Sequence, residues 1–375
     1  MNDNSFMRPE FYKKFQCESR NKYCQERPNP KENQEKLIIK SLNHQAISPQ
    51  HDFLRQPMNL DHRNLLTFSE DTRGTEVASW KQFSIAINDP QVSWVNITAS
   101  FTCRKENLKP VTRPLLLNFM NDATIFINQE QSIRIEREGV LLMRSYSETP
   151  VFKRLNTVKE PFIVGKPKSI IEFLGNVVIG DSTTTSHSAP FIQTKGDVII
   201  GGECLLRKYE GIEVSNLLIM PYGSLEIETK LLSPLVIVEE GHLFVGDISY
   251  LYVTHSGEQP AIQIEDGGEL TFDQPYDIHI RQTGLGACIS PLISSVAAKM
   301  SIVAVNSALW LNNNLEMQPT QMWKQELRAM LDGINGKRIA ETNSSDFQQS
   351  FYGFGAYREF SAGSRAPEFI QNVPQ

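Results

Sequence analysis

Apolar and polar residues alternate behind a glycine in five segments of this 375-residue chain. In each segment the second residue after the glycine is Val or Leu, and the fourth is again apolar. The five segments are Gly175–Ile179, Gly196–Ile200, Gly223–Ile227, Gly241–Val245 and Gly268–Phe272. Glycine permits a turn, and alternation with a period of two directs the apolar side chains to one face of a strand. Copies spaced by roughly 18 to 27 residues are typical of a parallel β-solenoid, in which each period makes one coil.

Further strands are predicted on both sides of these segments. Before them, alternation marks Leu115–Phe119, Thr124–Ile127, Ser132–Ile135 and Gly139–Met143, and the last is similar to a sixth copy. After them, Met322–Leu331 fits helical and strand spacing, and the alternation of its apolar residues favours a strand. Two or three strands per period predict a three-faced parallel β-helix with a filled interior and a solvated exterior.

An amphipathic helix is predicted where the regular pattern begins. Its buried positions are expected to be Val77, Trp80, Phe83 and Ile87. Thr75 is the expected N-cap, Asn88–Pro90 ends the helix, and Val92–Thr98 alternates as a strand. Because the end of a solenoid exposes unpaired strand groups and apolar interior, we expect this helix to cover that end.

Two regions of different composition follow from this pattern. Residues 1–74 are rich in polar and charged residues and predict a largely disordered leader. Residues 75–372 predict a single β-helix domain, and the aromatic segment Phe351–Tyr357 is expected to close its C-terminal end.

Charge, hydropathy and cysteine spacing argue against several kinds of partner and site. The formal net charge is −6 and Lys and Arg form no long run, so nucleic acid is not an expected partner. No stretch is apolar enough to span a bilayer, and the first eight residues contain no apolar core of a secretory signal. The five cysteines are scattered, without a CxxC pair, and predict neither a zinc site nor a disulfide framework. Cys103, Cys204 and Cys288 stand among apolar residues and are expected to be buried free thiols.

Three alternating residues are the best candidates for a ligand-binding site. Asp277, His279 and Arg281 project from one face of a predicted strand and offer a carboxylate, an imidazole and a cation in one row. Polysaccharide lyases and hydrolases use clustered carboxylates, with Ca²⁺ and a basic residue in lyases. Alternation alone also explains the three residues, as the solvated face of a strand whose Ile278 and Ile280 point inward.

No catalytic, metal or cofactor site is predicted with them. Acidic residues gather at turns, where Ca²⁺ ligands are possible but solvated turns are the simpler interpretation. These residues are Glu239, Glu240, Glu258, Glu265, Asp266 and Glu269. The chain has no GxSxG, GxxxxGK or HExxH motif, so no catalytic set is recognisable. Asn96–Thr98 fits a glycosylation acceptor, yet it lies within a predicted strand and is expected to be a half-buried edge.

The chain resembles the pectate-lyase-like adhesive domains of Gram-positive bacterial surface proteins, which are often encoded beside WxL-type cell-wall proteins. The resemblance covers about residues 75 to 365 and depends on an opening segment, the glycine-led coils and a closing segment. The residues that carry it outside the coils are Val77–Thr98, Phe272–Arg281, Leu309–Leu311, Trp323, Gly333 and Tyr357–Arg358. Two features of the family are not found, namely a signal peptide and a Trp-x-Leu or sortase-type anchor motif.

The resemblance implies an all-β, right-handed parallel β-helix exposed at the cell surface. It implies a non-enzymatic adhesive or cell-wall-associated module that binds a host or cell-wall glycan, or an extracellular protein. An alternative is a polysaccharide lyase or hydrolase on the same type of β-helix. A third hypothesis, a phage tail fibre or spike, predicts a stable trimer.

Overall fold

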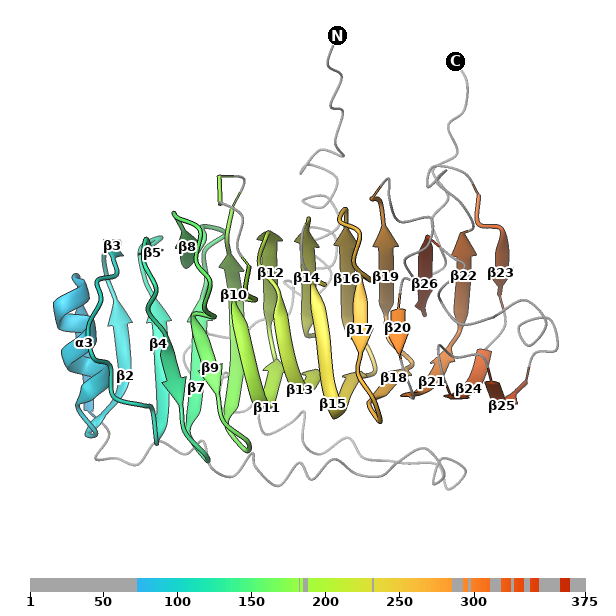
Figure 1. Cartoon of the computed structure of the whole chain (residues 1–375), viewed down its shortest axis with the longest axis horizontal. Helices are drawn as coiled ribbons and strands as arrows, with labels where there is room; N and C mark the ends of the chain where they lie inside the picture. The colour runs from blue at the N-terminus through green and yellow to red at the C-terminus, as the bar shows by residue number, and fades with distance from the viewer. Residues whose placement is uncertain are drawn as a thin grey trace, which may run out of the picture. The chain divides into compact units, whose positions relative to one another are not determined.

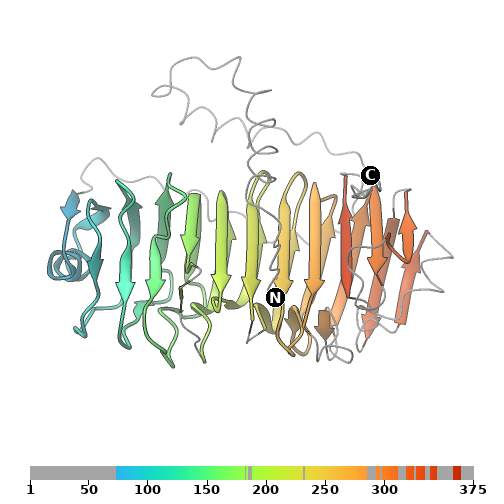
Figure 2. The same cartoon turned by 90° about the horizontal axis from the view of Figure 1, so that it is seen from above.

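The computed structural model confirms the predicted fold class. It describes residues 73–181, 183–184, 188–230, 233–284, 293–295, 298–310, 318–324, 327–333, 338–343 and 358–364. These residues form a parallel β-solenoid of about 7 turns, whose strands lie side by side in two perpendicular views (Figures 1 and 2). The predicted leader up to residue 72 and the aromatic segment Phe351–Tyr357 lie outside the described residues, as does Cys288.

Three ladders of parallel strands build the coils, and we number them by the order in which the chain enters them. Ladder 1 contains β1 (Arg73–Val77), β2 (Val92–Ile97), β4 (Pro114–Phe119), β7 (Val140–Ser145), the start of β10 (Ile170–Ile179), the ends of β11 (Ile192–Ile200), β13 (Ile212–Ile219) and β15 (Leu235–Val245), then β18 (Glu269–Asp273) and β21 (Ala298–Ala304). Ladder 2 contains β3 (Phe101–Thr102), β5 (Ile125–Ile127), β8 (Phe152–Arg154), the end of β10, β12 (Glu203–Lys208), β14 (Ser224–Thr229), β16 (Tyr250–His255) and β19 (Asp277–Gln282). Ladder 3 contains β6 (Ile133–Ile135), β9 (Ile163–Gly165), the starts of β11, β13 and β15, then β17 (Ile262–Ile264) and β20 (Ile293–Ser295). Three ladders agree with the three-faced β-helix predicted from the strand count.

The glycine-led segments lie in two ladders, not in one. Asp197, His242 and Glu269, which follow three of the glycines, stand in one row of ladder 1. Asn176 and Ser224, which follow the other two, stand in one row of ladder 2. The spacing between successive glycines is therefore not one coil in every case, because only Gly241 and Gly268 are successive copies in the same ladder, although the predicted inward positions are correct. These positions are Val177, Ile179, Val198, Ile200, Leu225, Ile227, Leu243, Val245, Leu270 and Phe272, and all are buried.

Close packing between coils, more than a left-handed backbone, explains most of these glycines. Of the five, only Gly175 has a positive φ, at 80°. A Cβ on Gly196, Gly223 or Gly241 would lie 2.1, 2.3 or 2.2 Å from a carbonyl oxygen of the preceding coil. A side chain does not fit at this separation, so the coils approach closely only where glycine stands.

The predicted helix is present, but it begins later than expected. The helix α3 (Trp80–Asn88) follows Ser79, whose hydroxyl accepts a hydrogen bond from the backbone N–H of Gln82. Thr75 as the N-cap is wrong, because Thr75 lies in β1, which pairs with β2. Trp80 and Phe83 are buried and pack on Phe101, at the end of the stack where Figure 1 shows the helix. Whether the helix acts as a cap stays a prediction.

The C-terminal end departs from the parallel pattern. β26 (Glu359–Gly363) lies antiparallel between β19 and β22 (Asn306–Trp310), so a late segment of the chain enters ladder 2 (Figure 1). β23 (Gln321–Trp323) pairs antiparallel with β22, and β24 (Leu327–Gly333) continues ladder 1 beside β25 (Arg338–Thr342). β24 confirms the favoured strand over residues 327–331. Antiparallel pairs need no parallel crossover, so these strands extend the ladders without a further full coil.

Two neighbouring glycines test the close approach between coils. A Cβ on Gly202 would lie 2.2 Å from the backbone nitrogen of Gly175, whereas a Cβ on Gly201 meets nothing closer than 3.4 Å. Gly202→Ala is therefore expected to lower the free energy of unfolding by about 1–3 kcal/mol, as overpacking does, and Gly201→Ala to leave it nearly unchanged. Urea unfolding followed by circular dichroism measures both, and equal midpoints for the two variants would contradict the expectation.

Candidate functional site

The three predicted site residues project from the outer face of ladder 2. Asp277, His279 and Arg281 alternate along β19 with Ile278 and Ile280, which are fully buried in the interior. The side chain of Asp277 is largely buried, whereas those of His279 and Arg281 are about one third exposed. The predicted placement of all three on one face is confirmed.

Glu359 of β26 joins these residues into one hydrogen-bonded cluster. Nε2 of His279 lies 3.2 Å from Oδ1 of Asp277, and Nδ1 lies 3.2 Å from Oε1 of Glu359. Nε of Arg281 donates to Oε2 of Glu359 over 2.8 Å. The antiparallel register pairs Arg281 with Glu359, so the insertion of β26 brings the carboxylate to the two basic side chains. We call Asp277, His279, Arg281 and Glu359 the ionic cluster.

Tyrosines of the neighbouring coil border the ionic cluster. The hydroxyl of Tyr252 donates to Oδ2 of Asp277 over 3.0 Å, and its ring stacks on the imidazole of His279 with the centroids 5.9 Å apart. Tyr250 lies on the same face of β16, and its ring centroid is 5.0 Å from that of Tyr276. The outer face of ladder 2 thus presents aromatic rings directly beside fixed charges.

The carboxylates keep His279 protonated near neutral pH. Burial lowers the pKa of His279, but the hydrogen bonds to Asp277 and Glu359 and their negative charges outweigh this effect and raise the pKa to about 9. Burial raises the pKa of Glu359, whereas the hydrogen bonds and positive charges of His279 and Arg281 lower it below its ordinary value. Charge-assisted hydrogen bonds therefore hold the four side chains in one arrangement.

This arrangement suits recognition better than proton transfer. A general base needs a lone pair on the atom that accepts the proton. Both ring nitrogens of His279 face carboxylate oxygens, and the protonated imidazole donates to both. Nε of Arg281 already donates to Glu359. The fixed aromatic rings and charges can instead bind the hydroxyl groups and ring faces of a ligand.

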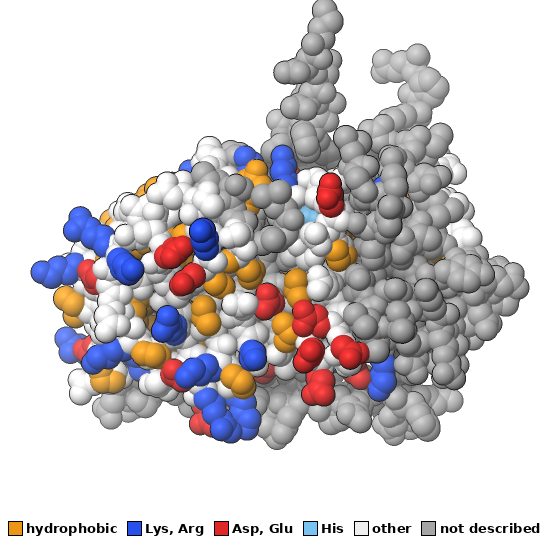
Figure 3. Space-filling model, viewed as in Figure 1, with side chains coloured by type: hydrophobic (Ala, Val, Ile, Leu, Met, Phe, Trp, Pro, Cys, Tyr) orange, Lys and Arg blue, Asp and Glu red, His pale blue; other side chains and the backbone are white. Residues whose placement is uncertain are grey.

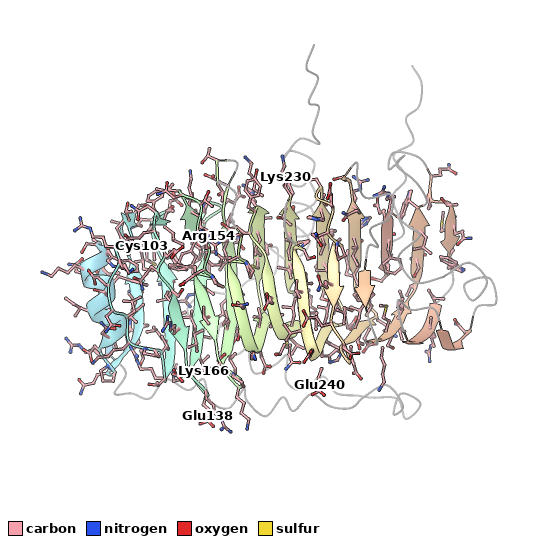
Figure 4. The ribbon with its side chains drawn as sticks, in the orientation of Figure 1. Cys103, Glu138, Arg154, Lys166, Lys230 and Glu240 are labelled. Atoms are coloured by element: carbon pink, nitrogen blue, oxygen red, sulfur yellow. The ribbon has the colours of Figure 1, made fainter. Side chains whose placement is uncertain are left out.

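The acidic turns do not come together as a metal site. Glu239, Glu240, Asp266 and Gly267 line a shallow hollow of about 230 Å³. The described residues contain no group of three or more His, Cys, Asp or Glu side chains placed to hold a metal ion. Figure 3 shows acidic side chains gathered on the lower part of the described surface, where Figure 4 places Glu240 at the rim of the stack. These turns therefore provide a negative surface.

The described cysteines are inert. Cys103 and Cys204 are buried free thiols, as predicted, and burial raises the pKa of both. A buried thiol with a raised pKa forms little of the reactive thiolate. They pack the interior and offer no nucleophile.

The alternation in the sequence identified three of the four residues of the ionic cluster. Asp277, His279 and Arg281 were recognisable by alternation within five consecutive residues. Glu359 was not, because it stands 80 residues from His279 and nothing local shows that β26 inserts beside β19. Tyr252 could have been found by aligning successive coils, since Tyr252 and His279 are direct neighbours in the ladder.

Comparison with known protein families, curated proteins and solved structures gives no match to this chain. The described residues contain no helix that is long and apolar enough to cross a membrane.

The ionic cluster predicts a stability that falls at alkaline pH. Because folding raises the pKa of His279, its contribution is complete below the unfolded pKa near 6.5 and is lost as the pH rises through about 9. The difference in thermal midpoint between the wild type and His279→Gln should therefore be largest at pH 6 to 6.5 and shrink toward about pH 9.5. Differential scanning fluorimetry across this range measures it.

His242→Gln is the matched control for this experiment. Burial lowers the pKa of His242, so this residue is neutral throughout the alkaline window. Its replacement should shift the midpoint by the same amount at pH 7 and pH 9.5. If the difference in thermal midpoint between the wild type and His279→Gln is also the same at pH 7 and pH 9.5, the cluster does not hold a proton on His279.

Proposed function

We propose that this chain is a non-enzymatic binding module, and that the outer face of ladder 2 around the ionic cluster binds a glycan or protein ligand. The observation that carries the proposal is the cluster itself. Four charged side chains from β19 and β26 hold one another beside the rings of Tyr250, Tyr252 and Tyr276. Tyrosine is enriched at recognition surfaces because it combines an apolar ring with a hydroxyl group.

Preorganisation supports recognition by this face. Each member of the cluster is held by another member, so little side-chain entropy remains to be lost when a ligand binds. The backbone beneath is a ladder paired on both sides of β19, by β16 and β26. A rigid face of this kind places hydrogen-bond donors, acceptors and ring faces at fixed distances from one another.

The proposed setting is the surface or wall of a bacterial cell. The support is the resemblance of the sequence to Gram-positive adhesive domains, together with a solenoid that offers long lateral faces. Repetitive coils produce extended binding surfaces because each coil adds a row of outward side chains.

A binding assay tests the proposal. The full chain, fluorescently labelled, is titrated onto isolated Gram-positive cell walls, an array of neutral and acidic glycans, and extracellular-matrix proteins. Saturable binding to at least one is expected, and Tyr276→Ala or Arg281→Gln should weaken it about tenfold, the effect of losing one good polar or aromatic contact. Arg134→Gln is the matched control, because Arg134 is exposed on β6 of ladder 3.

Two outcomes would count against this function. Saturable binding to none of the three ligand classes removes the adhesive proposal. Equal binding by the wild type, Tyr276→Ala and Arg281→Gln would show that the binding surface lies outside the ionic cluster.

A turnover assay distinguishes the non-enzymatic binding function from the alternative, a polysaccharide lyase or hydrolase. The protein is incubated with pectin, alginate and glycosaminoglycans, with and without Ca²⁺, while absorbance and reducing ends are followed. No turnover above a buffer blank is expected. Turnover that disappears in Asp277→Ala would overturn the non-enzymatic proposal in favour of the enzyme.

A further inference from the structure

A groove of about 460 Å³ opens on the outer face of ladder 1, away from the residues of the ionic cluster. Its lining residues are Trp94 and Asn96 of β2, Leu116 and Asn118 of β4, and Arg144 of β7. Trp94 stands beside Leu116 in register, and Asn118 stands between Asn96 and Arg144. Three successive coils thus place one apolar row and one polar row side by side.

The polar row is a chain of oriented hydrogen bonds. Nε of Arg144 donates to Oδ1 of Asn118 over 3.1 Å, and Nδ2 of Asn118 donates to Oδ1 of Asn96 over 3.0 Å. Because an arginine only donates, the amide oxygen of Asn118 must face Arg144, and the amide nitrogen of Asn118 must face Asn96. Asn96 then accepts through its own amide oxygen, which leaves its amide nitrogen at the end of the row. The two ends of the row therefore present hydrogen-bond donors, the guanidinium of Arg144 and the side-chain amide of Asn96.

The apolar row is set by a glycine. A Cβ on Gly74 of β1 would lie 1.8 Å from Nε1 of Trp94, so the indole lies over the backbone of the adjacent strand. The ring remains half-buried, and Leu116 continues the apolar row on the next coil. The face of an aromatic ring carries a negative quadrupole, which attracts the C–H groups on the face of a sugar ring.

Charge decides which ligand this groove fits. Within the described part of the chain no carboxylate pairs with Arg144, whose guanidinium lies over the exposed ring of Tyr146 at 5.7 Å. The groove thus combines an uncompensated positive charge and amide donors with an apolar floor. A ligand that satisfies all three needs an anionic group, hydrogen-bond acceptors and an apolar ring face.

We propose that this groove is a subsite for an acidic saccharide, with the anionic group on Arg144, a sugar ring on Trp94 and Leu116, and ring oxygens or hydroxyls on Asn96. This inference rests on the proposed binding function and names the ligand class for a second surface. Asn118 acts as a positioning residue, because it orients both donors through its own amide. Asn96 is half-buried in β2, and β2 pairs with β1 on one side and with β4 on the other. Asn96 therefore belongs to this row and does not lie at the edge of a sheet.

Titration calorimetry with defined oligosaccharides tests the proposal. The probes are a hyaluronan hexasaccharide, its carboxyl-reduced neutral form and a chondroitin sulfate hexasaccharide, each added to the full chain. Both acidic probes should bind, and the carboxyl-reduced probe should bind at least about tenfold more weakly, the loss expected for one charge-assisted hydrogen bond.

Variants locate the binding. Arg144→Gln and Trp94→Ala should each weaken binding of the acidic probes about tenfold or more, and Arg144→Gln should also abolish the preference over the neutral probe. Asn118→Leu, which has nearly the same volume, should weaken binding while the thermal midpoint changes little. Arg134→Gln, the exposed control on ladder 3, should bind like the wild type.

The outcomes separate this subsite from the proposed function. Equal binding of the acidic and neutral probes overturns the charge assignment, and absence of binding to all three probes overturns the subsite. Binding that is unchanged in Arg144→Gln but lost in Arg281→Gln also overturns the subsite while the proposed function stands. Binding that is lost in Arg144→Gln but unchanged in Arg281→Gln and Tyr276→Ala supports the subsite alone.

Discussion

The register between successive coils is the constraint on which this structure depends. Parallel pairing places each residue over its counterpart in the next coil at a separation of about 4.8 Å, and the side chains of one row must share that space. Where the backbone itself comes closer, glycine is required, as at Gly196, Gly223 and Gly241, whose Cβ atoms would meet carbonyl oxygens of the coil before. The same register gathers apolar residues into continuous inward rows and brings outward polar residues into direct contact.

Both candidate surfaces are products of that register. In ladder 1 it sets Asn96, Asn118 and Arg144 in one row, so that three modest polar residues become an oriented chain of donors. In ladder 2 it sets Tyr252 beside His279, and the antiparallel β26 adds Glu359 as a second carboxylate beside that of Asp277. The two surfaces differ in charge for this reason. The ionic cluster pairs its charges internally, whereas the groove keeps the charge of Arg144 for a ligand.

The alternation of apolar residues predicted the solenoid, its inward positions and the shared face of Asp277, His279 and Arg281, because these follow from the period of a strand. It did not predict which ladder a segment joins, since the glycine-led segments share one local pattern in two ladders. It could not predict Glu359, because the place where β26 inserts is decided by contacts such as Phe360 against Phe272, which are distant in sequence. Trp94 and Asn118 lie in correctly predicted strands, yet only the coil register shows that they line one groove.

Buried polar residues show where a pattern of apolar positions is least informative. Arg154 lies fully buried among the strands in Figure 4, with Nε 3.6 Å from the equally buried Glu210, and its terminal nitrogens donate to the carbonyl oxygens of Ala189 and Pro190. His255 and Gln282 likewise direct ring and amide nitrogens at carbonyl oxygens near corners of the coil. The corners are where the ladders stop pairing backbone groups, and an unpaired buried carbonyl destabilises the fold. Arg154, His255 and Gln282 therefore complete backbone hydrogen bonds near the corners, a role that the apolar pattern of the strands does not predict.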